Sequence, residues 1–271
     1  MWFFNQATRK EAPKSQEQKR LLSYQPANMQ GSGTRREQED SFAFVNATDV
    51  TEIKRNGLLA LVADGMGGME DGRAVSSAAA GMITDDFRKM DRSQNPGIQL
   101  KESIFRADRA LYDRFAGNGG TTLVACIFFQ ENMYFASVGD SYLYLKRGDG
   151  IYRLNREQTC RQEAYLALLK SGSLDTAQAD ADKDGARLSQ FLGSGWLDDV
   201  DALCRPWRLF EGDVLLLCSD GVGNVLTEQT LLSCLSEPSA SQCCRRIEKE
   251  IHKQARPDQD NYTALVIFCR Y

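Results

Sequence analysis

The chain contains 271 residues, 42% of them hydrophobic, with a formal net charge of −4 and a pI near 5.3. This length fits one large domain or two small ones, and the apolar share is ample for a buried core. The acidic balance gives no electrostatic footprint for nucleic acid, and no apolar run is long enough to span a bilayer. We expect a protein that binds neither nucleic acid nor membrane, and we take it to be a monomer.

Cysteine usage and the N-terminal segment bear on the compartment. The eight cysteines include no CxxC pair, and three lie inside apolar strand-like runs, where a buried free thiol is the expected state: Cys126, Cys218 and Cys269. Residues 1–4 are apolar, but polar residues follow at once, so the h-region of a signal peptide is missing. We expect a reducing cytoplasm, with residues 1–27 as a flexible polar extension and residues 28–271 as one domain.

Apolar patterns predict the elements of the first half of this domain. Alternation predicts a strand at 41–45, and a continuous apolar run predicts a buried strand at 58–63. A helix should begin at Pro96. Short turns at 130–132 and 148–150 predict an antiparallel meander over 121–154. A helix over 70–90 is expected to pack its small residues onto a sheet, namely Ala74, Ser77, Ala78 and Gly81.

The second half of the domain is less regular. A helix is expected over 162–169, followed by a polar, acidic flap over 171–185. Helices over 227–235 and 239–254 precede a last strand at 264–268. Strands that are first separated by helices and then grouped favour a layered α+β arrangement over a doubly wound parallel sheet.

Acidic residues stand at the ends of five predicted strands. Asp64 ends the buried run 58–63, and the glycines after it let backbone carbonyls and amides approach a ligand closely. An Asp-Gly turn alone is common, but five carboxylates brought together would repel one another unless hard divalent cations filled the site. The sequence therefore predicts an oxygen-rich site for magnesium, manganese or calcium if these strand ends converge. The other four ends carry Glu39-Asp40, Asp140, Asp220 and Asp260.

These motifs occur in an order that resembles a known family. Over residues 28–271 the chain is similar to the metal-dependent serine/threonine protein phosphatases of type 2C. Met66, where eukaryotic members usually carry histidine, is typical of the bacterial branch. The resemblance implies a four-layer αββα sandwich of two antiparallel sheets with helices outside. It rests on Arg35…Glu39-Asp40, Asp64-Gly65-Met66-Gly67-Gly68, Gly120-Thr121-Thr122, Gly139-Asp140-Ser141, Leu188-Ser189-Gln190-Phe191-Leu192-Gly193, Ser219-Asp220-Gly221 and Asp260-Asn261-Tyr262-Thr263.

The resemblance also implies roles for the site residues. Two divalent cations, Mn²⁺ or Mg²⁺, would share Asp64 as a bridging ligand, with the Gly65 carbonyl on the first cation. Arg35 would bind the substrate phosphate through its planar fork of donors. The implied metal site comprises Asp40, Asp64, Gly65, Asp140, Asp220 and Asp260. Within it, Asp220 and Asp260 would hold the second cation, Asp40 and Glu39 would hold metal-bound waters, Asn261 would support the ligands, and Asp140 would help to bind a third, weaker ion.

Hydrolysis at phosphorus is the chemistry that such a binuclear centre allows. Two divalent ions about 4 Å apart can share a bridging water and lower its pKa toward neutrality. The hydroxide then attacks in line, while the metals and Arg35 stabilise charge on the equatorial oxygens. The one histidine, His252, lies among charged residues of a predicted helix and is expected on the surface, which argues against histidine acid–base catalysis.

Three positions depart from the family pattern, and none of them is a predicted direct ligand. Tyr142 stands where arginine is usual, Asn224 where an acid is frequent, and Glu157-Gln158 where Asp-His is common. We therefore expect an active phosphatase for phosphoserine and phosphothreonine in proteins, which opposes a bacterial serine/threonine kinase in signal transduction. Two alternatives stay open. One is a regulatory or binding module that lost turnover, and the other is another metal-dependent phosphoesterase such as a nuclease, against which the lack of Lys/Arg clusters counts.

Overall fold

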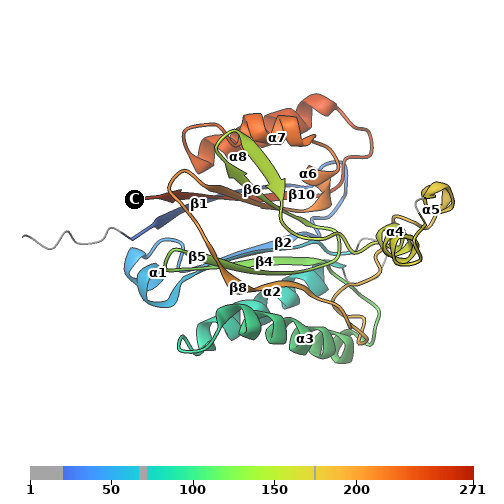
Figure 1. Cartoon of the computed structure of the whole chain (residues 1–271), viewed down its shortest axis with the longest axis horizontal. Helices are drawn as coiled ribbons and strands as arrows, with labels where there is room; N and C mark the ends of the chain where they lie inside the picture. Colours follow the sequence, from blue (N-terminus) through green and yellow to red (C-terminus); the bar gives the residue numbers. More distant parts are fainter. Residues whose placement is uncertain (1–20, 67–71, 174) are drawn as a thin grey trace, which may run out of the picture.

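The computed structural model describes residues 21–66, 72–173 and 175–271. Two five-stranded antiparallel sheets stack face to face, with helices on both outer faces (Figure 1). The first sheet contains, in spatial order, β1 (Ser23–Gly31), β10 (Tyr262–Arg270), β9 (Val214–Cys218), β6 (Tyr142–Arg147) and β7 (Gly150–Arg153). The second contains β2 (Ser41–Val45), β3 (Leu58–Ala63), β4 (Leu123–Phe129), β5 (Asn132–Val138) and β8 (Asp201–Arg208). The predicted α+β sandwich of four layers is confirmed.

Helices form the two outer layers. The second sheet is covered by α2 (Gly72–Lys89) and α3 (Pro96–Phe115), and the first by α7 (Glu228–Cys234) and α8 (Ala240–Gln254) (Figure 1). Short helices complete the described chain: α1 (Val50–Asn56), α4 (Cys160–Lys170), α5 (Ala177–Ala181) and α6 (Asp220–Gly223). The predicted flap over 171–185 contains α5, which extends away from the sandwich together with α4 (Figure 1).

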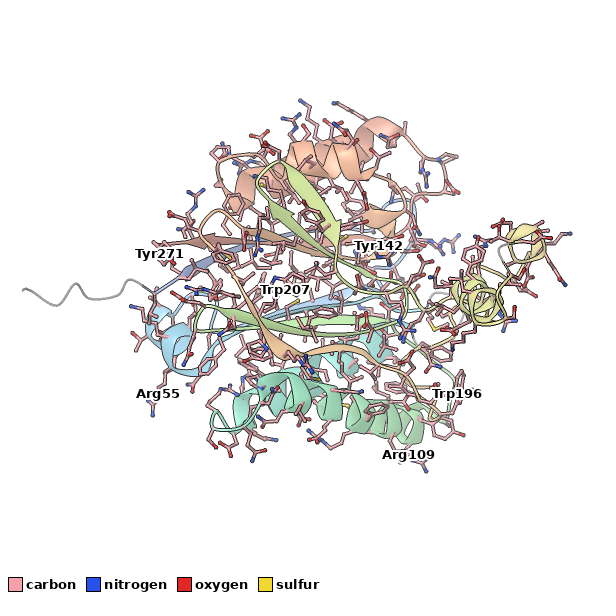
Figure 2. The ribbon with its side chains drawn as sticks, in the orientation of Figure 1. Arg55, Arg109, Tyr142, Trp196, Trp207 and Tyr271 are labelled. Atoms are coloured by element: carbon pink, nitrogen blue, oxygen red, sulfur yellow. The ribbon has the colours of Figure 1, made fainter. Side chains whose placement is uncertain are left out.

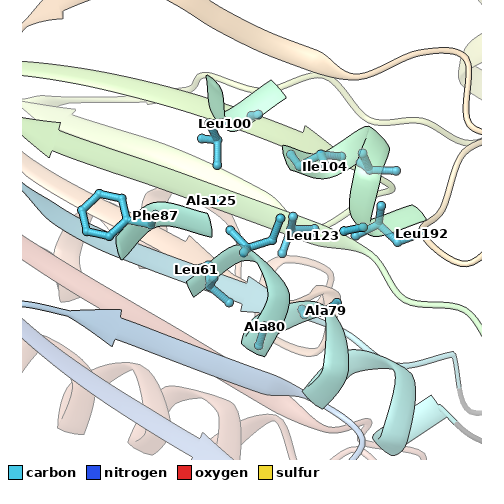
Figure 3. Close-up of a cluster of buried hydrophobic side chains, with 14 of the residues drawn as sticks. Leu61, Ala79, Ala80, Phe87, Leu100, Ile104, Leu123, Ala125 and Leu192 are labelled. Atoms are coloured by element: carbon cyan, nitrogen blue, oxygen red, sulfur yellow. The ribbon is translucent and has the colours of Figure 1, made fainter. Parts of the chain in front are cut away.

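The strand β3 serves both faces of its sheet. All six residues of Leu58–Ala63 are fully buried, as the continuous apolar run predicted. Its even-numbered residues belong to the apolar cluster between the two sheets. Its odd-numbered residues belong to the cluster beneath α2 and α3, where Leu61 lies near Ala79 and Ala80 (Figure 3). A third cluster fills the space between the first sheet and α8. Both faces of β3 are therefore packed against buried apolar side chains up to the end of the strand at Ala63.

The packing face of α2 differs from the prediction. Ala74, Ser77 and Gly81 are exposed, and Ala78 is half-buried at the margin of the apolar cluster, so the expected small-residue face is not the one that α2 packs on the sheet. The reason is that a stripe at a spacing of four residues, which includes three larger side chains, buries more apolar surface. That stripe comprises Val75, Ala79, Ile83 and Phe87. The expected start of this helix at residue 70 lies outside the described residues.

The predicted meander over 121–154 is two separate hairpins. The strands β4 and β5 pair in one sheet, whereas β6 and β7 pair in the other. The chain crosses between the sheets at Gly139, whose φ is +96° and whose added Cβ would lie 2.8 Å from Thr122. Short turns fix antiparallel pairing within each hairpin, but they do not determine which sheet each hairpin joins. This crossing carries Asp140 to the edge between the sheets.

The N-terminal boundary also needs correction. Residues 23–27, which were assigned to the flexible extension, belong to β1 and pair with β10 from Ser23 opposite Arg270 onward. Tyr24 is buried against Phe128, and its hydroxyl donates to the carbonyl of Gln130 at 2.6 Å. Pro26 and the polar residues of this stretch give no strand pattern, although β1 is an edge strand, where proline is tolerated. Residues 1–20 lie outside the described structure.

Two further expectations concern the thiols and the membrane. Cys126, Cys218 and Cys269 are buried free thiols, as predicted. Over the described ranges, the helices are all too short or too polar to cross a bilayer.

Candidate metal centre

The predicted acidic strand ends meet at one edge of the sandwich. Asp40 immediately precedes β2 and Asp64 immediately follows β3, and these strands pair Ser41 with Ala63. Asp220 follows β9 and Asp260 precedes β10, and these strands pair in antiparallel fashion too. A cavity of about 160 Å³ opens between the sheets at this edge. It is lined by Arg35, Glu39, Asp64, Gly65, Met66, Thr122, Asp140, Leu188, Asp220 and Asp260.

Asp40 lies behind this cavity and is only 5% exposed. Its Oδ2 accepts hydrogen bonds from the hydroxyls of Ser219 at 2.8 Å and Thr263 at 2.7 Å. Its Oδ1 is buried and has no hydrogen-bond partner among the described residues. Burial raises the pKa of this carboxyl to about 6, against an ordinary 3.8. One oxygen is therefore anchored, and the other is left for a cation or a water.

Asp64 is fixed through its backbone. The hydroxyl of Thr121 donates to the Asp64 carbonyl at 2.8 Å, and the Asp64 amide donates to the Thr122 hydroxyl at 3.2 Å. Burial raises the pKa of the Asp64 carboxyl well above its ordinary value, and the negative charges of Asp40 and Asp220 raise it further. The carboxyls of Asp64 and Asp220 are close enough to share a proton. Such a pair is stable only with a proton or a cation between its members.

The pKa values of two further buried acids, Asp140 and Asp220, are raised for the same reasons. Burial, followed by the charges of Asp220 and Glu157, raises the pKa of Asp140 to about 7. Burial and then the charge of Asp260 raise the pKa of Asp220. Asp220 is the first residue of α6, which begins two residues after the end of β9. Burial and neighbouring acids therefore make the charged form of both side chains less favourable than in water.

Arg35 is the cationic side chain at the rim of the cavity. Its Nη2 lies 2.7 Å from Asp260 Oδ2, and the guanidinium side chain remains 49% exposed. The loop that carries it is held by the amide and hydroxyl of Thr34, which both donate to the Gln259 carbonyl. Gly33 is required there, because its φ is +58° and an added Cβ would lie 2.4 Å from the Asp260 carbonyl. The arginine is therefore placed at the cavity but is free to meet a ligand.

Asn261 connects this loop to the last strand. Its Oδ1 accepts from the Glu39 amide at 2.8 Å, and its Nδ2 donates to the carbonyls of Ser32 and Glu37. These three bonds span more than two hundred residues of sequence and hold Arg35 and Glu39 on the same side of the cavity. The side chain supports the site and does not face a ligand directly.

The residues present fit divalent cations. The donors are carboxylate oxygens and a backbone carbonyl, which hard cations prefer. Asp40 Oδ1 has no hydrogen-bond partner among the described residues, and the carboxyls of Asp64 and Asp220 repel each other, while the charge of Arg35 offsets that of Asp220 only in part. Within the described ranges, no three acidic, histidine or cysteine side chains are already closed around one point as a ligand set. The individual ligand assignments therefore stay predictions.

Several residues that hold the site received no role from the sequence. Ser219 and Thr263 fix Asp40, and Thr121 and Thr122 fix Asp64. All four lie inside the motifs of the family resemblance, within three residues of an aspartate or a glycine. A hydroxyl that recurs close to an acid or a glycine turn is the available signal, because a buried carboxylate needs donors.

The sole histidine lies outside the cavity. His252 is exposed on α8, as predicted, and its Nε2 lies 3.0 Å from the Tyr262 hydroxyl. Gln158, one of the departures from the family pattern, has a structural position: its Oε1 accepts from the Gly139 amide at 2.9 Å, and its Nε2 donates to the Asp199 carbonyl. It therefore fixes the crossing that carries Asp140.

The sandwich and its acidic pocket place the chain in a class, that of the PPM-type protein phosphatases. The family model for Protein phosphatase 2C matches residues 24–164, more than half of the 271 residues. The chain therefore belongs to the protein phosphatase 2C family.

Two bacterial serine/threonine phosphatases are among the relatives with assigned names. The serine/threonine phosphatase stp of Listeria monocytogenes is 31% identical over 187 residues, which cover 66% of this chain and 72% of that protein. The serine/threonine protein phosphatase PstP of Mycobacterium tuberculosis is 25% identical over 234 residues, which cover 82% of this chain and 42% of that protein.

Solved structures share the fold. The serine/threonine phosphatase of S. agalactiae superposes with a TM-score of 0.75 at 23% identity, covering 91% of this chain and 99% of that one. The catalytic domain of PstP, solved in complex with two manganese ions, gives a TM-score of 0.70 at 22% identity, covering 93% and 99%.

Proposed function

We propose that the chain is a metal-dependent phosphoprotein phosphatase that hydrolyses phosphoserine and phosphothreonine. The observation that carries the proposal is the crowding of buried carboxyls around Asp64, with Arg35 as the cation at the rim, in a chain of the protein phosphatase 2C family. A phosphate monoester supplies the negative charge that Arg35 can bind, and two divalent cations supply the positive charge that the carboxyls lack.

Two cations, Mn²⁺ or Mg²⁺, would be held by Asp64, the Gly65 carbonyl, Asp220 and Asp260. Asp40 and Glu39 would act through waters, and Asp140 would contribute to a third, weaker site. Bound there, the cations supply Lewis acidity and lower the pKa of the attacking water.

The protein residues orient the substrate. The Arg35 guanidinium is half exposed, so its fork can donate two bonds to phosphate oxygens and hold the phosphorus at the cavity mouth. Thr34, Gly33 and Asn261 keep that arginine in place before substrate arrives. Preorganised donors of this kind stabilise charge that develops on the equatorial oxygens. No histidine lines the described cavity, so proton transfer to the leaving serine or threonine oxygen would come from water or from a side chain other than histidine.

The substrates follow from this chemistry. Phosphoproteins made by a serine/threonine kinase present the required monoester, and the relatives named serine/threonine phosphatases support this class. The side chain of Leu188 at the cavity wall brings the segment after α5 to the site, so that segment would contact the substrate polypeptide.

The test measures phosphate release from a phosphothreonine peptide with Mn²⁺, with EDTA, and with Asp220→Ala. We expect turnover that requires Mn²⁺ and falls more than about 100-fold in the variant, beyond the usual loss for a residue one shell further from a metal. Asp149→Ala, at an exposed turn between β6 and β7, is the matched control and should keep full activity.

Two outcomes would contradict the proposal. Folded protein that binds Mn²⁺ yet releases no phosphate from phosphopeptides would indicate a binding module on a phosphatase fold. Turnover of single-stranded DNA or a cyclic dinucleotide, with none on phosphopeptides, would indicate another phosphoesterase.

A further inference from the structure

Two residues that depart from the family pattern are bonded to each other. The Tyr142 hydroxyl donates to Asn224 Oδ1 at 2.6 Å, although 82 residues separate them. Asn224 in turn donates through Nδ2 to Asp220 Oδ2 at 3.3 Å. The departures therefore form one chain of hydrogen bonds that ends on a predicted metal ligand.

The order of these bonds fixes the amide of Asn224. Because the Tyr142 hydroxyl donates to Oδ1, the Nδ2 side of the amide must face Asp220. A flipped amide would turn an acceptor oxygen toward a carboxylate, which has no proton to donate when ionised. The bond to Nδ2 engages one oxygen of Asp220 and restricts rotation of its carboxylate, while the remaining lone pairs stay available for a cation.

Tyr142 itself is held firmly. It is 8% exposed, and its ring stacks on Tyr144 with centroids 5.7 Å apart and planes 7° from parallel. On the side of α6, an added Cβ at Gly223 would lie 2.3 Å from the Tyr142 ring, so glycine alone permits this contact. Since α6 has four residues, its placement depends on contacts with the neighbouring strands, and that of Gly223 with Tyr142 of β6 is one of them. Tyr142 lies toward the side of the sandwich from which α4 and α5 extend (Figure 2).

The same network reaches Asp140. The Arg153 guanidinium lies over the Tyr142 ring at 4.0 Å from its centroid and pairs with Glu157 at 3.2 Å. It also approaches the Asp140 carbonyl, with its Nη2 at 3.5 Å. Arg153 therefore adds a cation beside the tyrosine without placing one in the acidic cavity. The neutral Tyr142–Asn224 pair likewise adds no charge next to Asp220.

We infer that Tyr142 and Asn224 are positioning residues that orient the Asp220 carboxylate toward the second cation. The inference rests on the proposed metal-dependent function. Residues one shell from a metal typically change affinity or activity 10- to 100-fold when they are removed, and Asn224 has the geometry of such a residue. Its exposed side chain at the end of α6 makes a general packing role unnecessary.

The test measures Mn²⁺ binding directly, through the loss of the free Mn²⁺ electron paramagnetic resonance signal, without substrate. We expect Asn224→Ala to weaken binding about 10- to 100-fold and Tyr142→Phe about two- to tenfold, the range for one lost hydrogen bond. The double variant should be no weaker than Asn224→Ala, because both side chains act through Asp220. Tyr144→Phe is the matched control: it removes a hydroxyl from the same aromatic stack, one without a hydrogen-bond partner in the described structure, and should bind as wild type.

Kinetics separate positioning from loosening of the fold. Asn224→Ala should raise the Mn²⁺ concentration for half-maximal activity while the peptide KM and the rate at saturating Mn²⁺ stay near wild type. Its melting temperature in EDTA should not change. A structural role alone would instead lower that melting temperature and leave Mn²⁺ affinity intact.

Mn²⁺ affinities of Asn224→Ala and Tyr142→Phe within about twofold of wild type would overturn the inference, as would an equal loss in Tyr144→Phe. If the wild-type chain bound no Mn²⁺, the proposed metal centre and this inference would both be wrong. A wild-type chain that binds Mn²⁺ without releasing phosphate would overturn only the proposed function.

Discussion

Between the two sheets, the centre and one edge are built from opposite chemistry, although the same strands supply both. At the centre, Phe128, Leu217 and Leu265 pack as a fully buried apolar cluster. At the edge, a few residues further along, Asp40 and Asp64 are buried among other acids. The centre stabilises the fold in any buffer, because apolar burial needs no partner. The edge opposes folding until a cation arrives, because like charges are held together there.

Damage at the centre should have the largest effect on stability, and metal should not relieve it. Phe128 is fully buried against Tyr24, so Phe128→Ala should lower the free energy of unfolding by about 3–5 kcal/mol. Urea unfolding in EDTA and in Mn²⁺ measures it. Tyr152→Ala, on exposed β7, is the control and should stay within about 0.5 kcal/mol of wild type. A Phe128→Ala loss that disappeared with Mn²⁺ would show that centre and edge are not separate.

Removing one carboxylate charge at the edge should raise the stability of the chain without metal and lower it, relative to wild type, with metal. In EDTA, Asp64→Asn removes a charge from the repelling cluster and should raise stability by about 0.5–2 kcal/mol. With Mn²⁺ at 100 times the dissociation constant, wild type should gain about 2.7 kcal/mol and the variant should gain little. Thermal melts in the two buffers measure both.

Asp213 provides the matched control for Asp64. It is also buried, but its carboxylate accepts two hydrogen bonds from Arg147, at 2.8 and 2.7 Å. Asp213→Asn should therefore destabilise the chain in both buffers, because it breaks a satisfied pair. Destabilisation of Asp64→Asn in EDTA, as in Asp213→Asn, would contradict the repulsion at the edge.

The remaining expected effect is on the pH dependence of the metal-free chain. The folded pKa values of Asp40 and Asp140 are raised to about 6 and about 7, above those of the unfolded chain. Between about pH 4 and 7 the folded state therefore binds more protons, so stability falls as pH rises through this window. In EDTA the melting temperature should drop between pH 5.5 and 8, and less so in Asp64→Asn. An unchanged melting temperature would mean that the pKa values of these acids are not raised in the folded chain.

The strand ends were visible in the sequence because each joins an apolar run to an acid. The run before Asp64 is buried on both faces, so its pattern is unbroken and its end is sharp. The convergence of Asp40, Asp140, Asp220 and Asp260 with it needed the resemblance, since local patterns do not say which strands are neighbours. For the same reason, the sequence pattern predicts one meander over 121–154, whereas the structure has two hairpins in different sheets.

Other features left little or no local pattern. The strand β8 is half-buried to exposed and shows no alternation, and no strand was expected there. The contact of Arg35 with Asp260 joins residues 225 apart, and the bond of Tyr142 to Asn224 joins residues 82 apart. Such pairs depend on the completed tertiary structure, which periodicity in a short window cannot report.

The pairing of β1 with β10 sets when the phosphatase can first exist during synthesis. Ser23 lies opposite Arg270, so one sheet gains its outer strand only when the last strand of the fold has left the ribosome. Arg35 and Asp260 both lie just beyond the same end of this pairing, where Gly31 faces Tyr262, and Asn261 ties them together. A nascent chain that lacks residues 260–270 therefore has neither the rim of the cavity nor a partner for its first strand. Closure of such distant segments is intrinsically slow, and the rim of the cavity can form only after residues 260–270 have been synthesised.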